Sequence, residues 1–239
     1  MSLNVEKLTV TKEGKNIISN INFSHPHGEV LGLIGENGAG KTTLLHALVG
    51  KNQFAGDVSY KEINYIDENR KEDVITYCGD SSDLDTDLSA EVVLSYARFN
   101  QREDLSLRDE LVDAFELNDF LQRSTTTLSG GEKQRLNLAC SLYQGTDVVL
   151  WDEPTNYLDP RHVDALEGII SKYKSEKLFI ISSHNLSFLL SASERVLALK
   201  KGVLRFYENK EEVISKKLLN DIFSKEFLYV IKEGALLVK

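Results

Sequence analysis

Apolar residues follow two different patterns along this chain, and the change between them divides it into regions. Over residues 1–27, apolar segments at 3–10 and 17–23 partly alternate with polar residues and flank a glycine-containing turn at 12–15. This arrangement is typical of an antiparallel hairpin. From residue 128 onward, short apolar runs alternate with longer segments in which apolar residues recur at helical spacing. That order predicts a parallel sheet covered by helices.

Individual elements follow from the same patterns. The expected strands, including two hairpins near the C-terminus, are residues 30–34, 57–60, 63–66, 75–78, 147–151, 178–182, 196–199, 203–207, 227–231 and 235–238. The expected helices are residues 42–49, 89–99, 106–116, 132–143, 160–174, 186–192 and 210–225. Ser89 and Ser106 are expected to cap the second and third helices, because a serine hydroxyl accepts a hydrogen bond from the first helical turn. The short helices between residues 81 and 127 predict a small helical insert.

The most specific chemical signal lies between the strand at 30–34 and the helix that follows it. Residues 35–43 fit the phosphate-loop pattern G-x-x-x-x-G-K-[ST]. The candidate nucleotide-binding residues are Gly35, Glu36, Asn37, Gly38, Ala39, Gly40, Lys41, Thr42 and Thr43. Glycines allow backbone N–H groups to approach a polyphosphate, and the helix N-terminus adds a partial positive charge. Lys41 would bridge the β- and γ-phosphates, and the Thr42 hydroxyl would bind Mg²⁺.

Two carboxylates follow another strongly apolar strand, at residues 148–151. Asp152 and Glu153 stand at its carboxyl end, where parallel sheets collect their ligand-binding residues. In a phosphate-loop enzyme, Asp152 would hold Mg²⁺ through water, and Glu153 would orient or deprotonate the attacking water. Without the other motifs, the pair is equally consistent with a solvated Asp-Glu-Pro turn.

A second anion-binding turn is predicted at residues 128–135. Ser129 can cap the following helix, while Gly130 and Gly131 leave its first N–H groups accessible. One triphosphate does not require two such cradles on one chain, so this turn is expected to serve a nucleotide held mainly by a partner. Downstream, His184 follows an apolar strand. A neutral imidazole there could hydrogen-bond a γ-phosphate, although a single histidine in that place is more often structural.

Composition narrows the classes of protein that remain. The 239-residue chain has a formal charge of −9 and a pI near 5.2, which argues against a nucleic-acid-binding surface as its main feature. No apolar run approaches the roughly 18 residues needed to cross a bilayer, and the first residues contain no apolar signal segment. Cys78 and Cys140 stand beside apolar residues and are expected to be reduced core thiols in a cytosolic protein.

Five motifs in order resemble those of the nucleotide-binding subunit of an ATP-binding cassette (ABC) transporter, over roughly residues 1–207. They are GENGAGKTT as Walker A, LSGGEKQR as the signature, VVLWDEP as Walker B, NYLD as the D-loop and SSH as the switch histidine. The resemblance implies an α/β fold of the P-loop NTPase class, with a mixed or parallel sheet core. An antiparallel β subdomain and a small α-helical subdomain at about 81–127 would complete the domain. Residues 208–239 would add an accessory helix and a possible hairpin.

The resemblance also implies how the residues act. Two cassettes, identical or not, would face head to tail, and each ATP with its Mg²⁺ would be held between one Walker A and the opposite signature. The residues implied in cis are Lys41, Thr42, Asp152, Glu153 and His184, and those implied in trans are Ser129, Gly130 and Gly131, with Asp159 closing the D-loop. Glu132 of the signature is a further candidate nucleotide-binding residue. ATP hydrolysis would drive a separate transmembrane permease. The chain would then be peripheral on the cytoplasmic face of the cell membrane, with no nucleic-acid partner.

Two positions depart from the family pattern. Cassettes usually place an aromatic residue before the second strand to stack on adenine, yet none precedes Phe23, so no adenine-stacking residue is named. The family's magnesium-binding glutamine is replaced by Asp80, which is either a metal ligand or a solvated residue in the acidic run at 80–87. That run is also a candidate contact for basic loops of the membrane partner.

Two other functional classes stay open at this point. The NYLD D-loop resembles that of soluble translation-factor cassettes, although those typically join two cassettes in one chain. The missing aromatic and Asp80 would also suit a weakly hydrolysing, nucleotide-dependent interaction module. The residues Lys41, Glu153 and His184 argue against that module, because they are the groups that hydrolysis requires.

Overall fold

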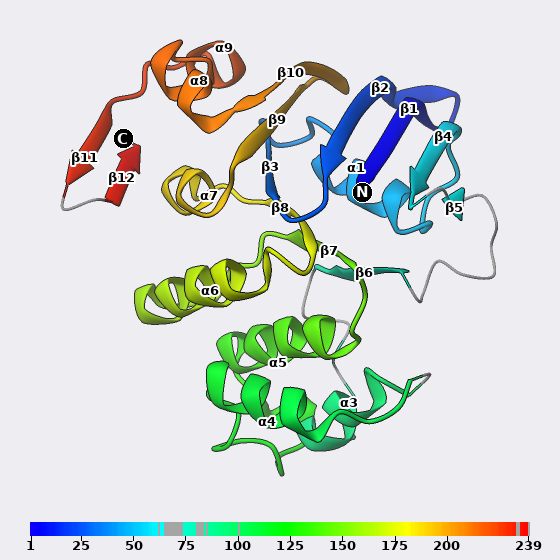
Figure 1. The fold of residues 1–239 in the computed structure, drawn as a ribbon, viewed down its shortest axis with the longest axis vertical. Coiled ribbons are helices and arrows are strands. Elements are labelled where there is room, and N and C mark those ends of the chain that lie inside the picture. The colour runs from blue at the N-terminus through cyan, green and yellow to red at the C-terminus, as the bar shows by residue number, and fades with distance from the viewer. Residues whose placement is uncertain are drawn as a thin grey trace.

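The computed structural model describes residues 1–61, 63–64, 74–79, 84, 86–99, 101–232 and 235–238 of the chain. Figure 1 shows an antiparallel sheet near the N-terminus, a central sheet beside it, and helices α3, α4 and α5 grouped at the bottom of the view. The expected α/β architecture is therefore confirmed, with the two kinds of sheet and the helical insert as separate parts.

Six strands form the central sheet, in the order β10-β9-β3-β8-β7-β6. The five strands from β9 to β6 run parallel, and β10 pairs antiparallel with β9 at the edge. The strand bounds are β3 Val30–Ile34, β6 Ile75–Cys78, β7 Val148–Asp152, β8 Leu178–Ser182, β9 Arg195–Lys200 and β10 Val203–Asn209. The predicted parallel sheet and its edge hairpin are confirmed.

Helices or the antiparallel sheet cover both faces of this sheet, which explains why its strands are continuous apolar runs in the sequence. In β7, Val149 and Trp151 belong to one buried cluster, and Val148 and Leu150 belong to another. The first cluster includes residues of three helices that cover one face, and the second includes residues of a single helix and of the antiparallel sheet. These helices are, on the first face, α5 Gly130–Tyr143, α6 Pro160–Tyr173 and α7 Leu186–Ala192, and, on the second, α1 Lys41–Leu48.

The antiparallel sheet has the order β2-β1-β4-β5. The predicted N-terminal hairpin is formed by β1 (Ser2–Lys12) and β2 (Lys15–Pro26), and Gly14 in its turn has a φ of 74°. The second pair consists of β4 (Ala55–Tyr60), which also pairs with β1, and the short β5 (Ile63–Asn64). The buried side of this sheet shares its apolar cluster with α1, so the sheet covers the helix that starts at the phosphate loop.

The helical insert contains α3 (Ala90–Tyr96) and α4 (Leu105–Ala114), which both pack against α5. Ser89 caps α3 as predicted. The predicted Ser106 cap is wrong, because α4 begins earlier and the carboxylate of Asp104 caps it. Aspartate is as good an N-cap as serine and also interacts favourably with the helix dipole, so it takes the position.

The chain after β10 forms two short helices, so the single helix predicted at 210–225 is wrong. The helices α8 (Lys210–Ser215) and α9 (Leu219–Phe223) are separated by a turn in which Lys217 has a φ of 51°. That left-handed backbone ends α8. Val213 from α8 and Ile222 from α9 are both buried, so two helices bury the apolar residues whose spacing predicted one.

The C-terminal hairpin is present as predicted. It consists of β11 (Tyr229–Lys232) and β12 (Ala235–Val238), which pair antiparallel. The Val238 N–H donates to the Ser187 hydroxyl of α7 at 3.0 Å, which joins the hairpin to the central domain.

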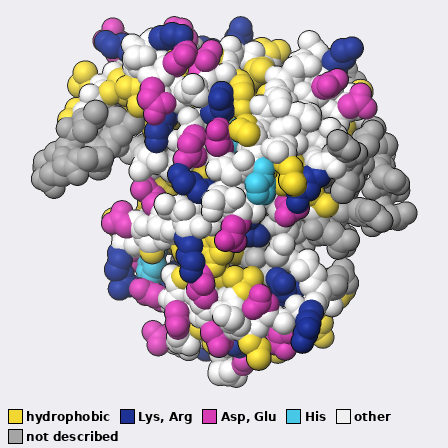
Figure 2. Space-filling view, in the orientation of Figure 1, with side chains coloured by type: hydrophobic (Ala, Val, Ile, Leu, Met, Phe, Trp, Pro, Cys, Tyr) yellow, Lys and Arg dark blue, Asp and Glu magenta, His cyan; other side chains and the backbone are white. Residues whose placement is uncertain are grey.

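Three further features of the described residues concern membrane crossing, the two cysteines and the surface charge. None of the described helices is long and apolar enough to cross a membrane. Cys78 is buried, Cys140 is half-buried, and both are free thiols as predicted. Figure 2 shows acidic and basic side chains mixed over the face in view, without a single large basic patch.

Candidate nucleotide-binding site

The predicted site residues collect at one edge of the central sheet. Because β3, β8, β7 and β6 are parallel neighbours, their carboxyl ends lie side by side. A pocket of about 600 Å³ opens at this edge. The predicted residues that line it are Asn37, Gly38, Ala39, Gly40, Lys41, Thr42, Thr43, Asp152, Glu153 and His184.

The phosphate loop leads directly into α1. Gly40 precedes the helix with a φ of 103°, in the left-handed region, and a Cβ there would clash with Ile18. Both the backbone and the available space therefore require glycine. Gly40, as the N-cap, has no side chain that could satisfy the first N–H groups of α1. These N–H groups are the donors that a phosphate anion accepts from.

Lys41 is the buried cation of the pocket, with an exposed fraction of 8%. Its ammonium group donates to the Gly35 carbonyl at 2.8 Å. Burial lowers the pKa of Lys41, while the nearby carboxylates of Glu153 and Asp152 oppose that shift. A polyphosphate at the N-terminus of α1 would therefore meet both open N–H donors and a buried positive charge.

Thr42 and Asp152 form the candidate metal site. The Thr42 hydroxyl donates to Asp152 Oδ2 at 2.6 Å, the Tyr77 hydroxyl donates to the same oxygen at 3.3 Å, and the Ser182 hydroxyl donates to Oδ1. Among the described residues, no group of three or more His, Cys, Asp or Glu side chains could hold a metal by itself. An oxygen pair with few protein ligands fits Mg²⁺, which keeps several waters and binds phosphate oxygens. The predicted ligand Asp80 lies outside the described residues, as does most of the acidic run at 80–87.

Glu153 follows β7 directly and has a φ of 55°, which is unusual for a residue with a side chain. Its N–H donates to the Ser182 carbonyl at 3.0 Å, which holds that backbone in place. Its Oε2 accepts from the His184 N–H at 2.9 Å, while Oε1 lies 3.3 Å from His184 Nε2 without hydrogen-bond geometry. Within the described residues, Oε1 is buried and has no hydrogen-bond donor. Leaving such an atom unsatisfied is costly, so the position fits one that a water molecule completes.

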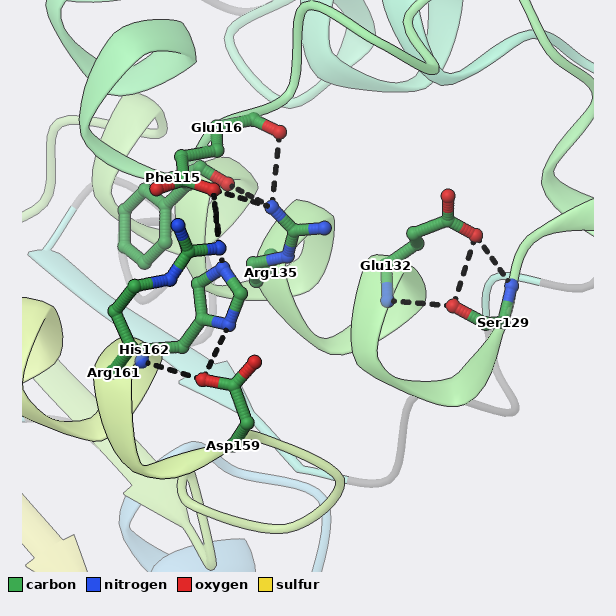
Figure 3. A network of polar contacts seen from close by, with 8 residues as sticks. All are labelled: Phe115, Glu116, Ser129, Glu132, Arg135, Asp159, Arg161 and His162. Atoms are coloured by element: carbon green, nitrogen blue, oxygen red, sulfur yellow. Dashed lines mark hydrogen bonds and ion pairs between the residues drawn. The ribbon is translucent and has the colours of Figure 1, made fainter.

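The signature turn starts α5 with a complete capping box, which Figure 3 shows. Ser129 Oγ accepts from the Glu132 N–H at 3.3 Å, and Glu132 Oε2 accepts from the Ser129 N–H at 2.7 Å. Arg123 donates to Glu132 Oε1 at 2.8 Å. Burial alone would raise the pKa of Glu132, but the hydrogen bonds from Ser129 and the charge of Arg123 lower it overall. The Glu132 carboxylate therefore supports the helix start in this structure.

The D-loop packs on the signature turn of the same chain. Tyr157 has a φ of 63°, and a Cβ on Gly130 would approach its ring to 3.2 Å. A Cβ on Gly131 would lie 2.9 Å from the Tyr157 carbonyl oxygen. Glycine at both positions therefore permits the close approach of the D-loop to the start of α5.

Asp159 is connected to the helical insert through a polar network, also drawn in Figure 3. It caps α6, and its Oδ1 lies 3.0 Å from His162 Nδ1. The other ring nitrogen of His162 lies 3.4 Å from Glu116 Oε2, which Arg161 also contacts at 3.1 Å. Arg135 of α5 donates to the Glu116 carbonyl at 2.9 Å. The D-loop, the signature helix and the end of α4 are thus joined in one network.

Several predicted residues do not line the pocket of their own chain. These are Ser129, Gly130, Gly131, Glu132 and Asp159, together with Gly35 and Glu36, whose carbonyls accept from Lys41. The signature turn nevertheless lies near the rim, because Gln134 of the same helix and the neighbouring Tyr157 do line the pocket.

Sequence reasoning missed part of the pocket wall. The residues concerned are Ile17, His46, Lys51, Tyr77, Gly79, Gln134, Asn156 and Tyr157. His46 follows Thr42 by one helical turn, and Tyr77 and Gly79 lie at the carboxyl end of β6. Helix periodicity and the strand-end rule could therefore have identified these three. Ile17 and Lys51 carry no comparable signal.

Comparisons with known proteins identify the family. A family model described as ABC transporter matches residues 18–156. A putative ABC transporter ATP-binding protein of Pyrococcus furiosus is 34% identical over 208 residues, covering 82% of this chain and 78% of its own. The hemin import ATP-binding protein HmuV of Pseudomonas aeruginosa is 29% identical over 239 residues, covering 95% and 94% of the two chains.

Solved structures agree on the fold. A dimeric ATP-binding cassette in a post-hydrolysis state, bound to ADP and Pi, superposes with a TM-score of 0.79 at 24% identity, covering 87% of this chain and 98% of its own. The matches support the transporter interpretation over the translation-factor-like and weakly hydrolysing alternatives. The chain belongs to the ABC transporter family, as an ATP-binding and ATP-hydrolysing subunit.

Proposed function

We propose that two copies of this chain clasp two Mg²⁺-bound ATP molecules between them and pass the resulting movement to a separate membrane permease. Residues 1–207 would form the ATPase domain, with the helical insert at 81–127, and residues 208–239 an accessory element. The permease would hold the chain on the cytoplasmic face of the membrane. This arrangement agrees with the family, whose members here include transporter ATP-binding proteins.

The hydrolytic part of the proposal is carried by one observation at Glu153. Among the described residues, Oε1 is buried without a donor, while the His184 N–H fixes Oε2. A carboxylate held by one oxygen can accept a proton from a water molecule through the other. Lys41 would stabilise negative charge that develops on the γ-phosphate. The half-exposed imidazole of His184 stands at the rim, where it would hydrogen-bond a γ-phosphate oxygen.

The metal part of the proposal rests on the hydroxyl contacts of Asp152. The Thr42 hydroxyl donates a hydrogen bond to Asp152, so the lone pairs of Thr42 Oγ1 stay available to a cation. Asp152 would hold the same cation through water. Mg²⁺, when bound, would supply positive charge that stabilises the negative charge of the phosphates.

The dimeric part of the proposal rests on the start of α5. Ser129 and Gly130 are exposed and do not line the pocket of their own chain. Among the described residues, the Ser129 hydroxyl accepts from the Glu132 N–H and from no earlier N–H of the helix, so the earlier N–H groups would form an anion site. A triphosphate bound at the Walker A pocket of another copy would complete that site.

Replacing Glu153 with glutamine tests the assignment. The amide keeps the size of the side chain but is a poor proton acceptor. We expect ATP binding within about twofold of the parent and hydrolysis reduced by at least about 100-fold. The variant should also accumulate an ATP-dependent dimer in size-exclusion chromatography with light scattering.

The exposed acid Asp164 on α6 provides the matched control, because Asp164→Asn removes a carboxylate outside the pocket. That variant should hydrolyse ATP at the parent rate. If Glu153→Gln hydrolysed ATP at the parent rate, Glu153 could not be the residue that accepts the proton from water.

A further inference from the structure

We propose that Tyr77 is a positioning residue for the metal site, and that its hydroxyl holds the Asp152 carboxylate in the orientation that Mg²⁺ binding requires. The inference rests on the metal site proposed above. It goes beyond that site by giving a role to a residue outside all five motifs.

The position of Tyr77 follows from the sheet. Strand β6 pairs in parallel with β7, and Tyr77 stands opposite Leu150, two residues before Asp152. Cys78 belongs to the apolar cluster on the α5 face, whereas Tyr77 packs against the cluster on the α1 face. The Tyr77 ring therefore lies in the pocket wall beside α1, and its hydroxyl ends 3.3 Å from Asp152 Oδ2.

The hydroxyl belongs to a set that fixes the carboxylate. Oδ2 of Asp152 accepts from Thr42 at 2.6 Å and from Tyr77, and Oδ1 accepts from Ser182. These donors come from α1, from β6 and from β8, so three separate elements restrain one side chain. A carboxylate restrained at both oxygens keeps its remaining lone pairs in one direction, and such outer partners commonly set the affinity of a metal site.

The Tyr77 ring is itself held in place. His46 of α1 contacts it edge to face, with ring centroids 4.9 Å apart and an interplanar angle of 69°. The ammonium group of Lys51 lies 4.7 Å from the ring centroid. A Cβ on Gly79 would lie 2.6 Å from Tyr77 Cζ and would contact the hydroxyl even more closely. Gly79 therefore leaves the space that the end of the Tyr77 side chain occupies.

A residue that only filled the core would need the ring and not the hydroxyl. Tyr77→Phe keeps the ring and its contacts with His46 and Lys51, so it separates the two roles. The probe is Mn²⁺, which replaces Mg²⁺ and whose free concentration is measured by electron paramagnetic resonance. Binding is measured in the presence of the non-hydrolysable nucleotide AMP-PNP, so the result does not depend on turnover.

We expect Tyr77→Phe to raise the Mn²⁺ dissociation constant on the order of tenfold, as loss of an outer partner of a metal ligand usually does. Metal-free binding of AMP-PNP in EDTA should stay within about twofold of the parent. Tyr207→Phe is the matched control, because the Tyr207 hydroxyl donates to the Ser24 carbonyl at 2.9 Å and lies outside the pocket. It should leave the Mn²⁺ dissociation constant unchanged.

A second variant tests the same contact from the other side. In Gly79→Ala the new methyl group should displace the Tyr77 ring and weaken Mn²⁺ binding to a similar extent. The double variant Tyr77→Phe/Gly79→Ala should be no weaker than Gly79→Ala alone, because both changes remove one contact. Parent-like Mn²⁺ binding by folded Tyr77→Phe would overturn the inference. A parent chain that binds AMP-PNP but no Mn²⁺ would instead overturn the proposed metal site.

Discussion

The two anion-binding turns of this chain begin their helices in opposite ways. At α1, the N-cap is a glycine without a capping side chain, and Lys41, the first residue of the helix, is buried. At α5, Ser129 and Glu132 form a complete capping box on an exposed surface. The first turn offers a bound anion uncapped N–H groups and the positive charge of Lys41. The second is a stable helix end with N–H groups near the surface.

The difference shows that the turn at α1 favours ligand binding at a cost in fold stability, whereas the cap at α5 stabilises the fold. A buried ammonium group costs stability, as the lowered pKa of Lys41 indicates, and a bound phosphate offsets that cost. An N-cap serine instead stabilises its helix by about 1 kcal/mol without any ligand. Changes at α1 should therefore affect ligand binding more than folding. Changes at α5 should affect folding slightly and association between copies more.

The largest effect is expected from Lys41→Met. Loss of the charge-assisted contacts to phosphate should weaken ATP binding about 100-fold, corresponding to roughly 3 kcal/mol. The fold should be no less stable, because methionine fills similar space without a buried charge. Isothermal titration calorimetry and thermal unfolding measure the two quantities. Lys51→Met, at a lysine on the pocket wall, is the control and should weaken binding much less.

If Lys41→Met lowered the unfolding free energy by more than about 1 kcal/mol, the claim that changes at α1 affect ligand binding more than folding would be wrong. Lys41 would then stabilise the fold itself, through its contact with the Gly35 carbonyl.

A smaller effect is expected from Glu132→Gln. Burial raises the pKa of Glu132, but the Ser129 hydrogen bonds and Arg123 outweigh it, so the folded value lies below the ordinary 4.5. The ionised carboxylate therefore stabilises the fold above pH 4.5, and this contribution is lost as the pH falls through the folded value. Glutamine keeps the capping box but loses the ion pair with Arg123, at a cost of about 0.5 kcal/mol at pH 7.

Urea unfolding at several pH values measures this difference, which should shrink as the pH falls below 4.5. The same substitution removes a negative charge beside the exposed N–H groups of α5, so the ATP-dependent dimer should become tighter. A pH-independent difference in stability, or a weaker dimer, would show that Glu132 acts in another way.

Most of the fold could be predicted from the sequence because the apolar pattern of each strand and helix matches the residues that are buried in the structure. The continuous apolar runs at β3, β7 and β8 predicted a parallel sheet covered by helices, and both faces of the observed sheet are covered. The failures occur where two signals of equal strength compete, or where no residue type in the sequence marks a break in a helix. Asp104 and Ser106 are both good caps, and spacing does not choose between them. The break at Lys217 carries no glycine or proline, so helical periodicity alone predicted one helix across it.

The candidate site was predictable where residues follow parallel strands, since the strand ends meet at one edge. That rule brought Lys41, Glu153 and His184 together. The strand-end rule could also have included Tyr77, which lines the pocket. A tyrosine in an apolar strand is, however, normally interpreted as a core residue. The contact of His162 with Glu116 was not predictable, because it joins residues far apart in the chain and depends on how α6 lies against the helical insert.

The central claim is that the turn at α5 serves a nucleotide held by another copy, and mixing two defective variants tests it directly. In a Glu153→Gln background, Lys41→Met disables the Walker A pocket, and Gly130→Asp places a carboxylate at the signature turn. Each variant alone should remain monomeric with ATP. A mixed pair contains one intact site only if the turn acts in trans. We predict that mixing restores an ATP-dependent dimer in size-exclusion chromatography with light scattering; a mixture that stays monomeric, under conditions where Glu153→Gln alone dimerises, would contradict the account.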